Sequence, residues 1–364
     1  MRAMILAAGY GTRLWPLTLD RAKPALPFMG RPLVGYVAEY LSRFGCGEII
    51  VNLHHRPESV RAALGDGRDF GVQLSYIEEP VILGTSGAID NARAYLEGET
   101  FIVVNGKIAT DIDLGDALAT HRRERALATL VLRRNVERER YSTVEVEGGL
   151  VKSFGGYPVF ASDNDGGESR ALESRIAGTG DQGAGFDGQG AGDSVEGAGT
   201  SVQGGAPLMF TGIQILEPRI FDYIPRGVFS HSVTDVYVPA IARGERIAAH
   251  VGGGMWHELS TIRRYLDISL ALMRLEGRDV EQGRGSLIEH GAQVSEAILW
   301  EGARVEAGAR VRRAVLGAGV RVARGEVIED AAVVRAALVN GEERPEKALP
   351  GELRGENFVV PLAQ

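Results

Sequence analysis

The chain is organised around one glycine-rich stretch near its start, Leu6-Ala7-Ala8-Gly9-Tyr10-Gly11-Thr12-Arg13, followed by Lys23-Pro24. The apolar run before it predicts a buried strand, and the glycines after it place bare backbone N–H groups at the carboxyl edge of a sheet. That edge is where α/β proteins bind phosphates. Gly9 and Gly11 let the backbone approach an anion, while Arg13 and Lys23 supply the positive charge that a polyphosphate needs.

Several interpretations of this loop compete. A dinucleotide-binding G-x-G-x-x-G turn fails, because its third glycine would fall at Leu14 and no acid ends the strand Ile49–Leu53. A P-loop fails because no G-K-[ST] sequence follows. An ordinary glycine turn with surface cations would account for a bare G-x-G. The longer pattern Gly-x-Gly-Thr-Arg-x-x-Pro-Leu-Thr, then Lys-Pro, favours a nucleotidyltransferase loop over that alternative.

Composition narrows the function classes. The 364 residues suffice for two domains, and 44% apolar with 24% charged residues is ordinary for a soluble protein. A net charge of −8 argues against nucleic acid or an anionic membrane as partner. Cys46 is the single cysteine, so no intrachain disulfide can form, and a cytoplasmic location is expected. No stretch approaches the length of a membrane span.

Strand and helix signals alternate over residues 1 to about 150. The pattern predicts an α/β fold with a mainly parallel, Rossmann-like sheet and helices on both faces. Residues 161–206 interrupt it with 13 glycines in 46 residues, and we expect a disordered insertion in a surface loop there. A functional lid is the less favoured alternative. Regular structure resumes at Pro207, and the first domain is expected to span residues 1–278.

A repeat follows the first domain. Gly-x-x-Val units begin at Gly291, Gly302, Gly308 and Gly317, with one interval of six residues. This pattern predicts a short left-handed parallel β-helix over residues 283–340, built on hexapeptide turns. Such stacks are usually structural or oligomeric, so a homo-oligomer formed through the β-helix is expected. The charged residues 341–364 predict a loose tail.

The first loop closely resembles the signature of the sugar-1-phosphate nucleotidyltransferases, and the resemblance extends further. Glu79-Pro80-Val81-Ile82-Leu83-Gly84-Thr85-Ser86-Gly87 looks like the family's base-binding segment. Val103–Gly106 and Thr211–Ile213 resemble the strand ends of its sugar side. Trp256–Thr261, followed by Tyr265-Leu266, looks like its W-x-D-I-G-T-x-x-x-Y-L. The mannose-1-phosphate guanylyltransferase-like group is the most similar branch, and many members carry a β-helix.

This resemblance implies a reaction in which an NTP, GTP being favoured, and a sugar 1-phosphate give an NDP-sugar and pyrophosphate. Arg13 and Lys23 would be the catalytic cations, with Arg13 on the β- and γ-phosphates and Lys23 near the α-phosphate. The implied nucleotide-binding residues are Leu6, Ala7, Ala8, Gly9, Gly11, Thr12, Glu79, Gly84, Thr85 and Ser86. The implied sugar-phosphate residues are Asn105, Lys107, Tyr157, Thr211 and Gly212. A magnesium ion is expected, with Glu258 as a ligand.

The chain departs from the family where metal and sugar phosphate bind. Lys107 stands where the family has a magnesium-binding Asp, and Glu258 stands where it has a second. The E-K-P motif appears as Gly156-Tyr157-Pro158. One explanation is a moved cation, with Lys107 clamping the sugar phosphate and partly replacing the metal charge. The alternative is a regulatory subunit that binds a nucleotide or NDP-sugar without turnover. Asp111 and Asp113 either recruit magnesium or act as the N-cap and a first-turn acid of a helix.

Overall fold

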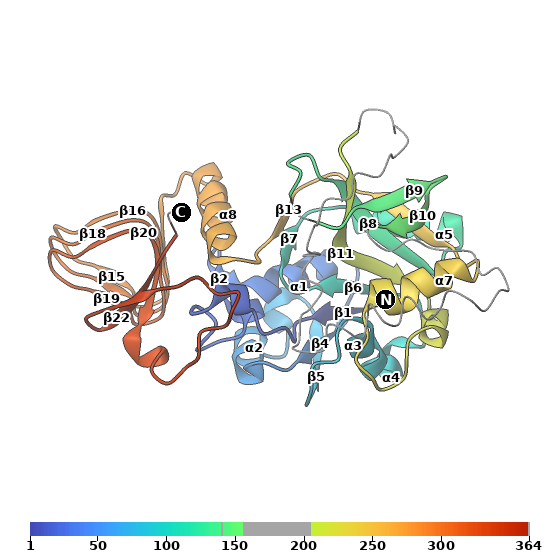
Figure 1. Cartoon of the computed structure of the whole chain (residues 1–364), viewed down its shortest axis with the longest axis horizontal. Helices are drawn as coiled ribbons and strands as arrows, with labels where there is room; N and C mark the ends of the chain where they lie inside the picture. The colour runs from blue at the N-terminus through green and yellow to red at the C-terminus, as the bar shows by residue number, and fades with distance from the viewer. Residues whose placement is uncertain (140, 156–204, 363–364) are drawn as a thin grey trace.

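The computed structural model describes residues 1–139, 141–155 and 205–362 (Figure 1). These residues form a nine-stranded sheet with flanking helices and, beyond helix α8 (Ile262–Leu275), a stack of short parallel strands. The insertion predicted at 161–206 lies, apart from its last two residues, outside the described part of the chain. Among the described residues, no helix is long and apolar enough to cross a membrane.

The large sheet has the strand order β5-β4-β1-β6-β11-β8-β12-β10-β9. Its strands are β1 (Arg2–Leu6), β4 (Glu48–Leu53), β5 (Gln73–Glu78), β6 (Phe101–Asn105), β8 (Ala128–Arg134), β9 (Val144–Glu147), β10 (Leu150–Phe154), β11 (Leu208–Leu216) and β12 (Ile247–Val251). Strand β1 runs parallel to β4 and β6, whereas β11 runs antiparallel to β6 and β8. The sheet is therefore mixed, and the prediction of a mainly parallel sheet fails in its second half, where β9 and β10 also pair antiparallel.

Helices cover both faces of the sheet, as predicted. On one face, α1 (Leu33–Arg43), α2 (Pro57–Leu64) and α5 (Leu114–Glu124) share a core with Ala3 and Ile5 of β1. On the other face, α3 (Ser86–Asn91), α4 (Arg93–Leu96) and α7 (Val238–Ala242) share a core with Met4. Successive strand residues point to opposite faces, so an apolar run such as Ala3-Met4-Ile5 suits a strand that is buried on both sides.

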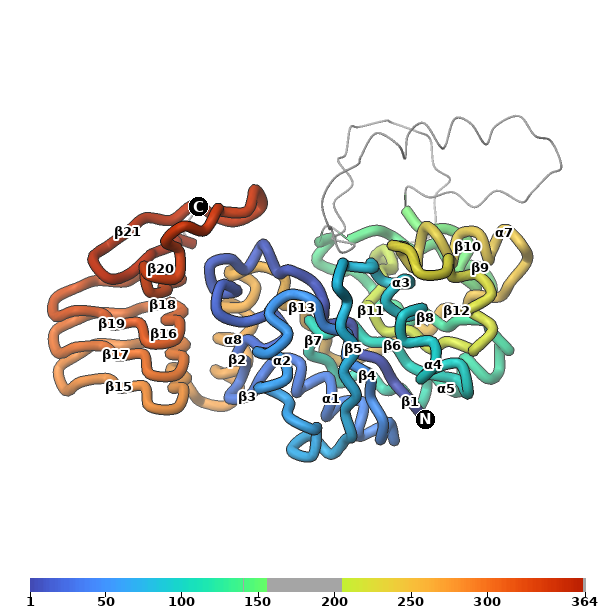
Figure 2. Tube along the Cα trace, turned by 90° about the horizontal axis from the view of Figure 1, so that it is seen from below, coloured from blue at the N-terminus to red at the C-terminus, as the bar shows by residue number. Residues whose placement is uncertain are grey.

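The C-terminal strands form a stack of parallel coils (Figure 2). One sheet contains β14 (Val280–Gln282), β16 (Gln293–Leu299), β18 (Arg310–Leu316) and β20 (Val327–Arg335), and another contains β15 (Leu287–Ile288), β17 (Arg304–Val305) and β19 (Arg321–Val322). Gln293 pairs with Arg310, and Arg310 with Val327, so each coil takes 17 residues. We call residues 280–335 the β-helix; its handedness stays a prediction.

The repeat is longer than the six-residue interval suggested. Glycines with positive φ recur every 17 residues in two series, Gly285, Gly302 and Gly319, and Gly291, Gly308 and Gly325. Glycine tolerates this left-handed conformation at each corner of the coil. Residues of the predicted units, such as Val305 and Val311, are buried in the interior of the stack.

The chain after Gly341 is not the loose tail that its composition predicted. Strand β22 (Asn357–Pro361) pairs antiparallel with β20, and β21 (Glu352–Arg354) pairs with β22. Val359, Val360 and Leu362 are buried. The charged residues flank a short apolar run, Phe358-Val359-Val360, and this run pairs with β20 at the open edge of the last coil.

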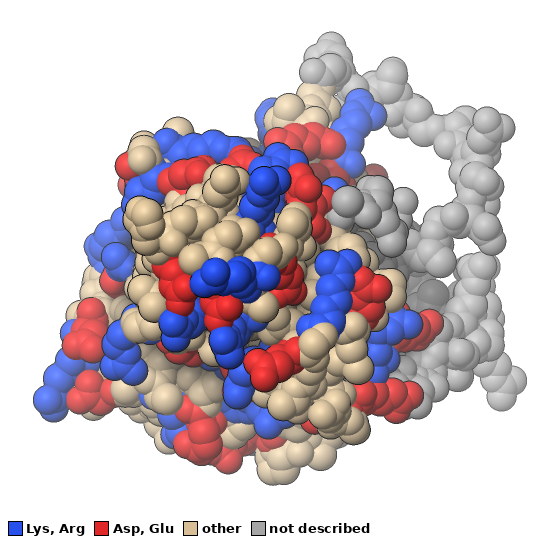
Figure 3. Space-filling model, turned by 90° about the vertical axis from the view of Figure 1, so that its left-hand side faces the viewer, with Lys and Arg blue, Asp and Glu red and all other residues tan. Residues whose placement is uncertain are grey.

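The surface of the β-helix carries interspersed positive and negative charges (Figure 3). Arginines on one coil bond to glutamates on the next, as in the pairs Arg304–Glu289, Arg321–Glu306 and Arg312–Glu329. All three arginines are more than half exposed. Exposed pairs of this kind contribute little stability each, so the buried apolar interior holds the coils together.

One apolar cluster joins the β-helix to the segment that follows the glycine-rich loop. Leu14, Leu17, Leu26 and Phe28 from the N-terminal part belong to the same buried cluster as Trp300. Helix α8 and the hairpin of β2 (Pro27–Phe28) and β3 (Arg31–Pro32) lie between the large sheet and the coils in both views (Figures 1 and 2).

Candidate active site

A cavity of about 380 Å³ lies over the end of β1, and most of the predicted site residues line it. Those that do are Leu6, Ala7, Ala8, Gly9, Gly11, Thr12, Arg13, Lys23, Gly84, Thr85, Asn105, Lys107, Thr211, Gly212 and Glu258. Glu79 and Ser86 are buried and are not among the lining residues, and Tyr157 lies outside the described residues. Residues more than 200 positions apart in the sequence thus share one cavity.

The glycine-rich loop folds tightly over Lys23. Gly11 has φ 68°, and a Cβ atom there would lie 2.9 Å from Cβ of Lys23. Only glycine fits this conformation and this space without a shift. Thr12 and Arg13 begin a 3-10 turn directly after Gly11, and Lys23 begins another. The close approach brings both predicted catalytic cations to the wall of the cavity.

A buried chain of hydrogen bonds holds the start of the loop. Asn52 Oδ1 accepts a bond from the Ala7 amide (2.7 Å), and Asn52 Nδ2 donates to Glu79 Oε1 (2.7 Å). Glu79 Oε2 in turn accepts a bond from the Leu83 amide (2.9 Å). Burial raises the pKa of Glu79, although these two donors oppose the shift. Both carboxylate oxygens of Glu79 are therefore engaged with the protein, and its role here is to tie β1, β4 and the segment 80–84 together.

The predicted base-binding segment divides into two parts. Gly84 and Thr85 line the cavity, and Gly84, at φ 77°, approaches the Ser230 carbonyl so closely that a Cβ atom would lie 2.4 Å from it. Thr85 Oγ1 accepts a hydrogen bond from the Ser232 amide (2.8 Å). Ser86 instead turns away and donates from its hydroxyl to Ser230 Oγ (2.8 Å). Gly84 and Thr85 thus contribute to the cavity wall, while Ser86 anchors the segment.

A bulge in β11 shapes the opposite wall. The pairing of β11 with β8 shifts between Phe210 and Ile213, which leaves Thr211 and Gly212 out of register. Gly212 has φ 81°, and a Cβ atom there would lie 2.2 Å from Asn105 Nδ2. Bulges next to sites aim particular residues at the ligand space. Here the bulge packs Gly212 against the Asn105 side chain, and all three residues Asn105, Thr211 and Gly212 line the cavity.

Lys107 and Glu258 form an ion pair in the cavity wall, with 3.1 Å between Nζ and Oε1. Strands β7 (Ile108–Thr110) and β13 (Trp256–Glu258) pair antiparallel and so bring the two residues together. Burial alone would raise the pKa of Glu258, but Lys107, Lys23 and Arg13 outweigh it and lower that pKa. Glu258 is therefore an ionised carboxylate at neutral pH, surrounded by cations.

Sequence reasoning missed several residues of the cavity wall. Arg264 lines it from the first turn of α8, where its Nε donates to the Glu258 carbonyl (3.0 Å) and its guanidinium pairs with Glu139. The Thr261 side chain caps this helix and fixes where it begins. Asn52 could have been found, because an asparagine inside the apolar run Ile49–Leu53 needs a buried partner. Arg264 carried no such signal.

The donor set does not fit a tightly held divalent cation. The Lys107 ammonium occupies the position of the expected ligand and already engages Glu258. No three His, Cys, Asp or Glu side chains gather into a metal-binding group anywhere in the described ranges. Asp113 caps α5 by accepting bonds from the Gly115 and Asp116 amides. Asp111 accepts a bond from the Met255 amide (2.5 Å), and neither aspartate lines the cavity. The helix-start interpretation therefore holds for Asp113, whereas Asp111 binds the Met255 backbone instead.

The fold is that of an α/β protein with a glycine-rich loop after its first strand, and this loop and a second set of polar residues line one cavity. The chain belongs to the nucleotidyl transferase family, whose sequence profile matches residues 2–274.

Comparisons with individual proteins agree with this assignment. The chain is 28% identical over 305 residues to the mannose-1-phosphate guanylyltransferase of Mycobacterium tuberculosis, covering 82% of this chain and 72% of that protein. It is 30% identical over 243 residues to the UTP–glucose-1-phosphate uridylyltransferase of Synechocystis, covering 62% of this chain and about half (52%) of that protein. HddC from Yersinia pseudotuberculosis shares the fold, with TM-score 0.53 and 21% identity over 74% of this chain and 99% of that one.

Proposed function

We propose that the protein transfers a nucleotidyl group from an NTP to a sugar 1-phosphate, releasing pyrophosphate. The observation that carries the proposal is the meeting of Arg13 and Lys23, on the glycine-rich loop side, with Lys107 and Gly212 on the other side of one cavity. Four cationic side chains (Arg13, Lys23, Lys107 and Arg264) and two acidic ones (Glu139 and Glu258) line this cavity. The excess of positive charge suits a ligand with several phosphates.

The reaction needs no protein nucleophile. An oxygen of the sugar phosphate attacks the α-phosphorus, a new O–P bond forms in line with the bond to the β-phosphate oxygen, and pyrophosphate leaves with that electron pair. Catalysis is then positioning and charge neutralisation. Arg13 holds the departing phosphates and Lys23 stabilises charge at the α-phosphate.

Lys107 supplies positive charge on the sugar-phosphate side. An ammonium has three N–H donors, so the bond to Glu258 leaves donors for a phosphate oxygen. The ionised Glu258 holds the ammonium at this position. We therefore assign no catalytic step to a magnesium ion held by the protein, since the residues present do not fit one.

GTP and mannose 1-phosphate are the favoured substrates. The similarity to the mycobacterial guanylyltransferase, which extends over 82% of this chain, supports this choice. The similarity to a uridylyltransferase keeps UTP and glucose 1-phosphate as the competing pair. We also propose a cytoplasmic location and self-association through the β-helix.

A second candidate function is nucleotide or NDP-sugar binding without turnover. The observation favouring it is the Lys107–Glu258 pair, which stands where the family resemblance places two metal-binding carboxylates. Retention of both Arg13 and Lys23 in the cavity favours catalysis over this alternative, because a binding protein needs no charge at the scissile bond.

The test is pyrophosphate release from each of four NTPs with a panel of sugar 1-phosphates, with magnesium and with excess chelator. We expect release with GTP and mannose 1-phosphate, persisting in chelator at no less than about a tenth of the rate. Loss of all release in chelator would refute the role given to Lys107. Tight GTP binding by calorimetry with no release from any pair would replace the proposal with the binding function.

A further inference from the structure

We propose that Arg21 is a positioning residue through which the β-helix holds the phosphate-binding segment, residues 9–23, in its working shape. The importance given to Lys23 in this inference rests on the proposed function. The β-helix itself contributes no residue to the cavity wall. It contacts the segment that carries the catalytic cations instead.

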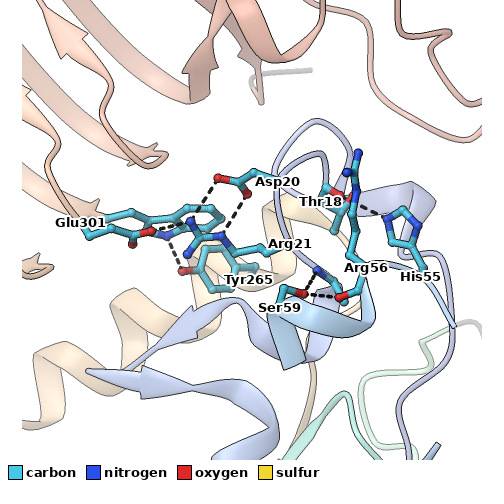
Figure 4. Close-up of polar contacts among 10 residues, drawn as sticks. Thr18, Asp20, Arg21, His55, Arg56, Ser59, Tyr265 and Glu301 are labelled. Atoms are coloured by element: carbon cyan, nitrogen blue, oxygen red, sulfur yellow. Dashed lines mark hydrogen bonds and ion pairs between the residues drawn. The ribbon is translucent and has the colours of Figure 1, made fainter. Parts of the chain in front are cut away.

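Arg21 lies at the junction of the two parts of the molecule (Figure 4). Its Nη2 atom donates to Glu301 Oε1 of the β-helix at 2.5 Å, and its Nε donates to Asp20 Oδ1 at 3.0 Å. The guanidinium carbon lies 4.8 Å from the ring centroid of Trp300. The Arg21 side chain is only 16% exposed. A planar guanidinium held by two carboxylates and an aromatic face has one preferred orientation.

The same junction also fixes the chain on the other side of Lys23. Trp300 Nε1 donates to the Tyr265 hydroxyl (3.1 Å), which donates to the Pro27 carbonyl (2.5 Å). Tyr265 and Trp300 are fully buried. Arg21 precedes Lys23 by two residues and Pro27 follows it by four, so Lys23 lies on a short span whose two ends are tied to one rigid junction.

The catalytic domain supplies other polar contacts of the segment, and Trp15 and Leu19 pack beside Ala348 of the C-terminal stretch. The Ala22 amide donates to Ser59 Oγ (2.8 Å), and His55 Nε2 lies 3.4 Å from the Thr18 carbonyl oxygen (Figure 4). The apolar cluster that contains Leu17 and Trp300 buries further surface between the segment and the β-helix, but apolar packing is non-directional. The polar contacts of Arg21 are therefore what orient the segment relative to the β-helix.

Small displacements matter at this position. A shift of about 1 Å in a catalytic group can cost about a hundredfold in rate. Gly11 packs closely on Lys23, since a Cβ atom added at Gly11 would lie 2.9 Å from Lys23 Cβ. If a substitution in the β-helix weakened the contacts of Arg21, the glycine-rich loop and Lys23 would therefore shift together, although neither is part of the β-helix.

The experiment compares Glu301→Ala with Glu329→Ala in the full chain. Glu301 is 43% exposed, and Glu329, which pairs with Arg312 elsewhere on the β-helix, is 52% exposed, so both variants should fold. For Glu301→Ala we expect kcat to fall about tenfold, the KM for sugar 1-phosphate to stay unchanged, and amide hydrogen exchange over residues 9–28 to rise. Glu329→Ala should match the wild type in all three.

Arg21→Lys and the double variant Arg21→Ala/Glu301→Ala complete the test. Lysine keeps the charge of arginine but lacks its planar fork, so we expect Arg21→Lys to retain part of the wild-type kcat. The kcat of the double variant should be no lower than that of Arg21→Ala alone. Unchanged kcat and unchanged exchange in Glu301→Ala would overturn the inference. A wild type without turnover would refute only the proposed function. The positioning role of Arg21 would then be judged from GTP affinity, measured by calorimetry, and from amide hydrogen exchange over residues 9–28.

Discussion

At the scale of single residues, the cavity depends on cations whose positions are set by glycines. Arg13 and Lys23 were predicted because the longer pattern around the loop, and not the G-x-G alone, resembles the signature of the sugar-1-phosphate nucleotidyltransferases. Glu79 also matched a motif, yet the structure gives both of its oxygens to Asn52 and Leu83. A motif shows which residues occur together, but it does not show which of them turn inward. That choice depends on buried partners that are distant in sequence.

Arg13→Ala and Lys23→Ala should each lower kcat/KM by about a hundredfold or more, because each removes a charge that stabilises the transition state. The melting temperature should change little. Lys152→Ala on β10 is the matched control, since Lys152 is exposed on the far part of the sheet. Steady-state pyrophosphate release measures the rates, and wild-type kinetics in either cation variant would contradict the assignment.

Lys107→Ala should lower turnover by about tenfold or more and raise the apparent pKa of Glu258, whose burial would no longer be opposed by its nearest cation. Lys107→Asp should create a carboxylate pair with Glu258 and a new Mn²⁺ site, detected by electron paramagnetic resonance of the bound ion. The wild type should bind no Mn²⁺ in the absence of nucleotide. Tight Mn²⁺ binding by the wild type would show that the donor set was misjudged.

Glu258 should also contribute to acid stability. Its pKa is lowered in the folded state, so its contribution is present above the unfolded value of about 4.5 and is lost as the pH falls through the folded pKa. Glu258→Gln should therefore flatten the decline of melting temperature as the pH falls below about 4.5. Thermal unfolding at several pH values measures this, with Glu329→Gln as the control. A variant that declines as steeply as the wild type would argue against the ion pair.

At the scale of elements, the bulge in β11 links fold to function. Gly212→Ala would force a left-handed φ on a residue with a side chain, at about 1–2 kcal/mol, and would press its Cβ on Asn105. We expect lower stability in denaturant unfolding together with lower activity. Gly98→Ala is the control, because nothing lies within 4 Å of its Cβ position. Full activity in Gly212→Ala would mean that the bulge has no role in the site.

Elements were predictable where local signals sufficed. Leu33, Val37, Tyr40 and Leu41 recur at helical spacing in the sequence, and helix α1 covers them and ends at Arg43, two residues before Gly45. The direction of β11 was not predictable. Whether a strand runs parallel or antiparallel to its neighbours depends on the edge of the sheet at which the preceding connection ends, and local sequence does not determine that edge. The 17-residue repeat was obscured because two glycine series six residues apart are interleaved within it.

At the scale of the whole molecule, the β-helix and the nucleotidyl transferase part share one buried cluster. A chain ending at residue 278 would lose Trp300, which contacts Tyr265 of α8, a side chain that is fully buried in the complete protein. We expect this fragment to aggregate or to melt more than about 10 °C below the full chain, since each buried side chain of this size contributes about 1.5–3 kcal/mol. Differential scanning calorimetry measures both melting temperatures. A soluble fragment that melts at the temperature of the full chain would contradict the expectation that the β-helix stabilises α8.

The central claim is that the cavity lined by Arg13, Lys23 and Lys107 transfers a nucleotidyl group. It is tested most directly by incubating the protein with GTP labelled at the α-phosphate and mannose 1-phosphate, and following the label. We predict label in GDP-mannose, one pyrophosphate per labelled product, and loss of both in Arg13→Ala. Label that stays in GTP, or that appears only in GDP or GMP, would contradict the account.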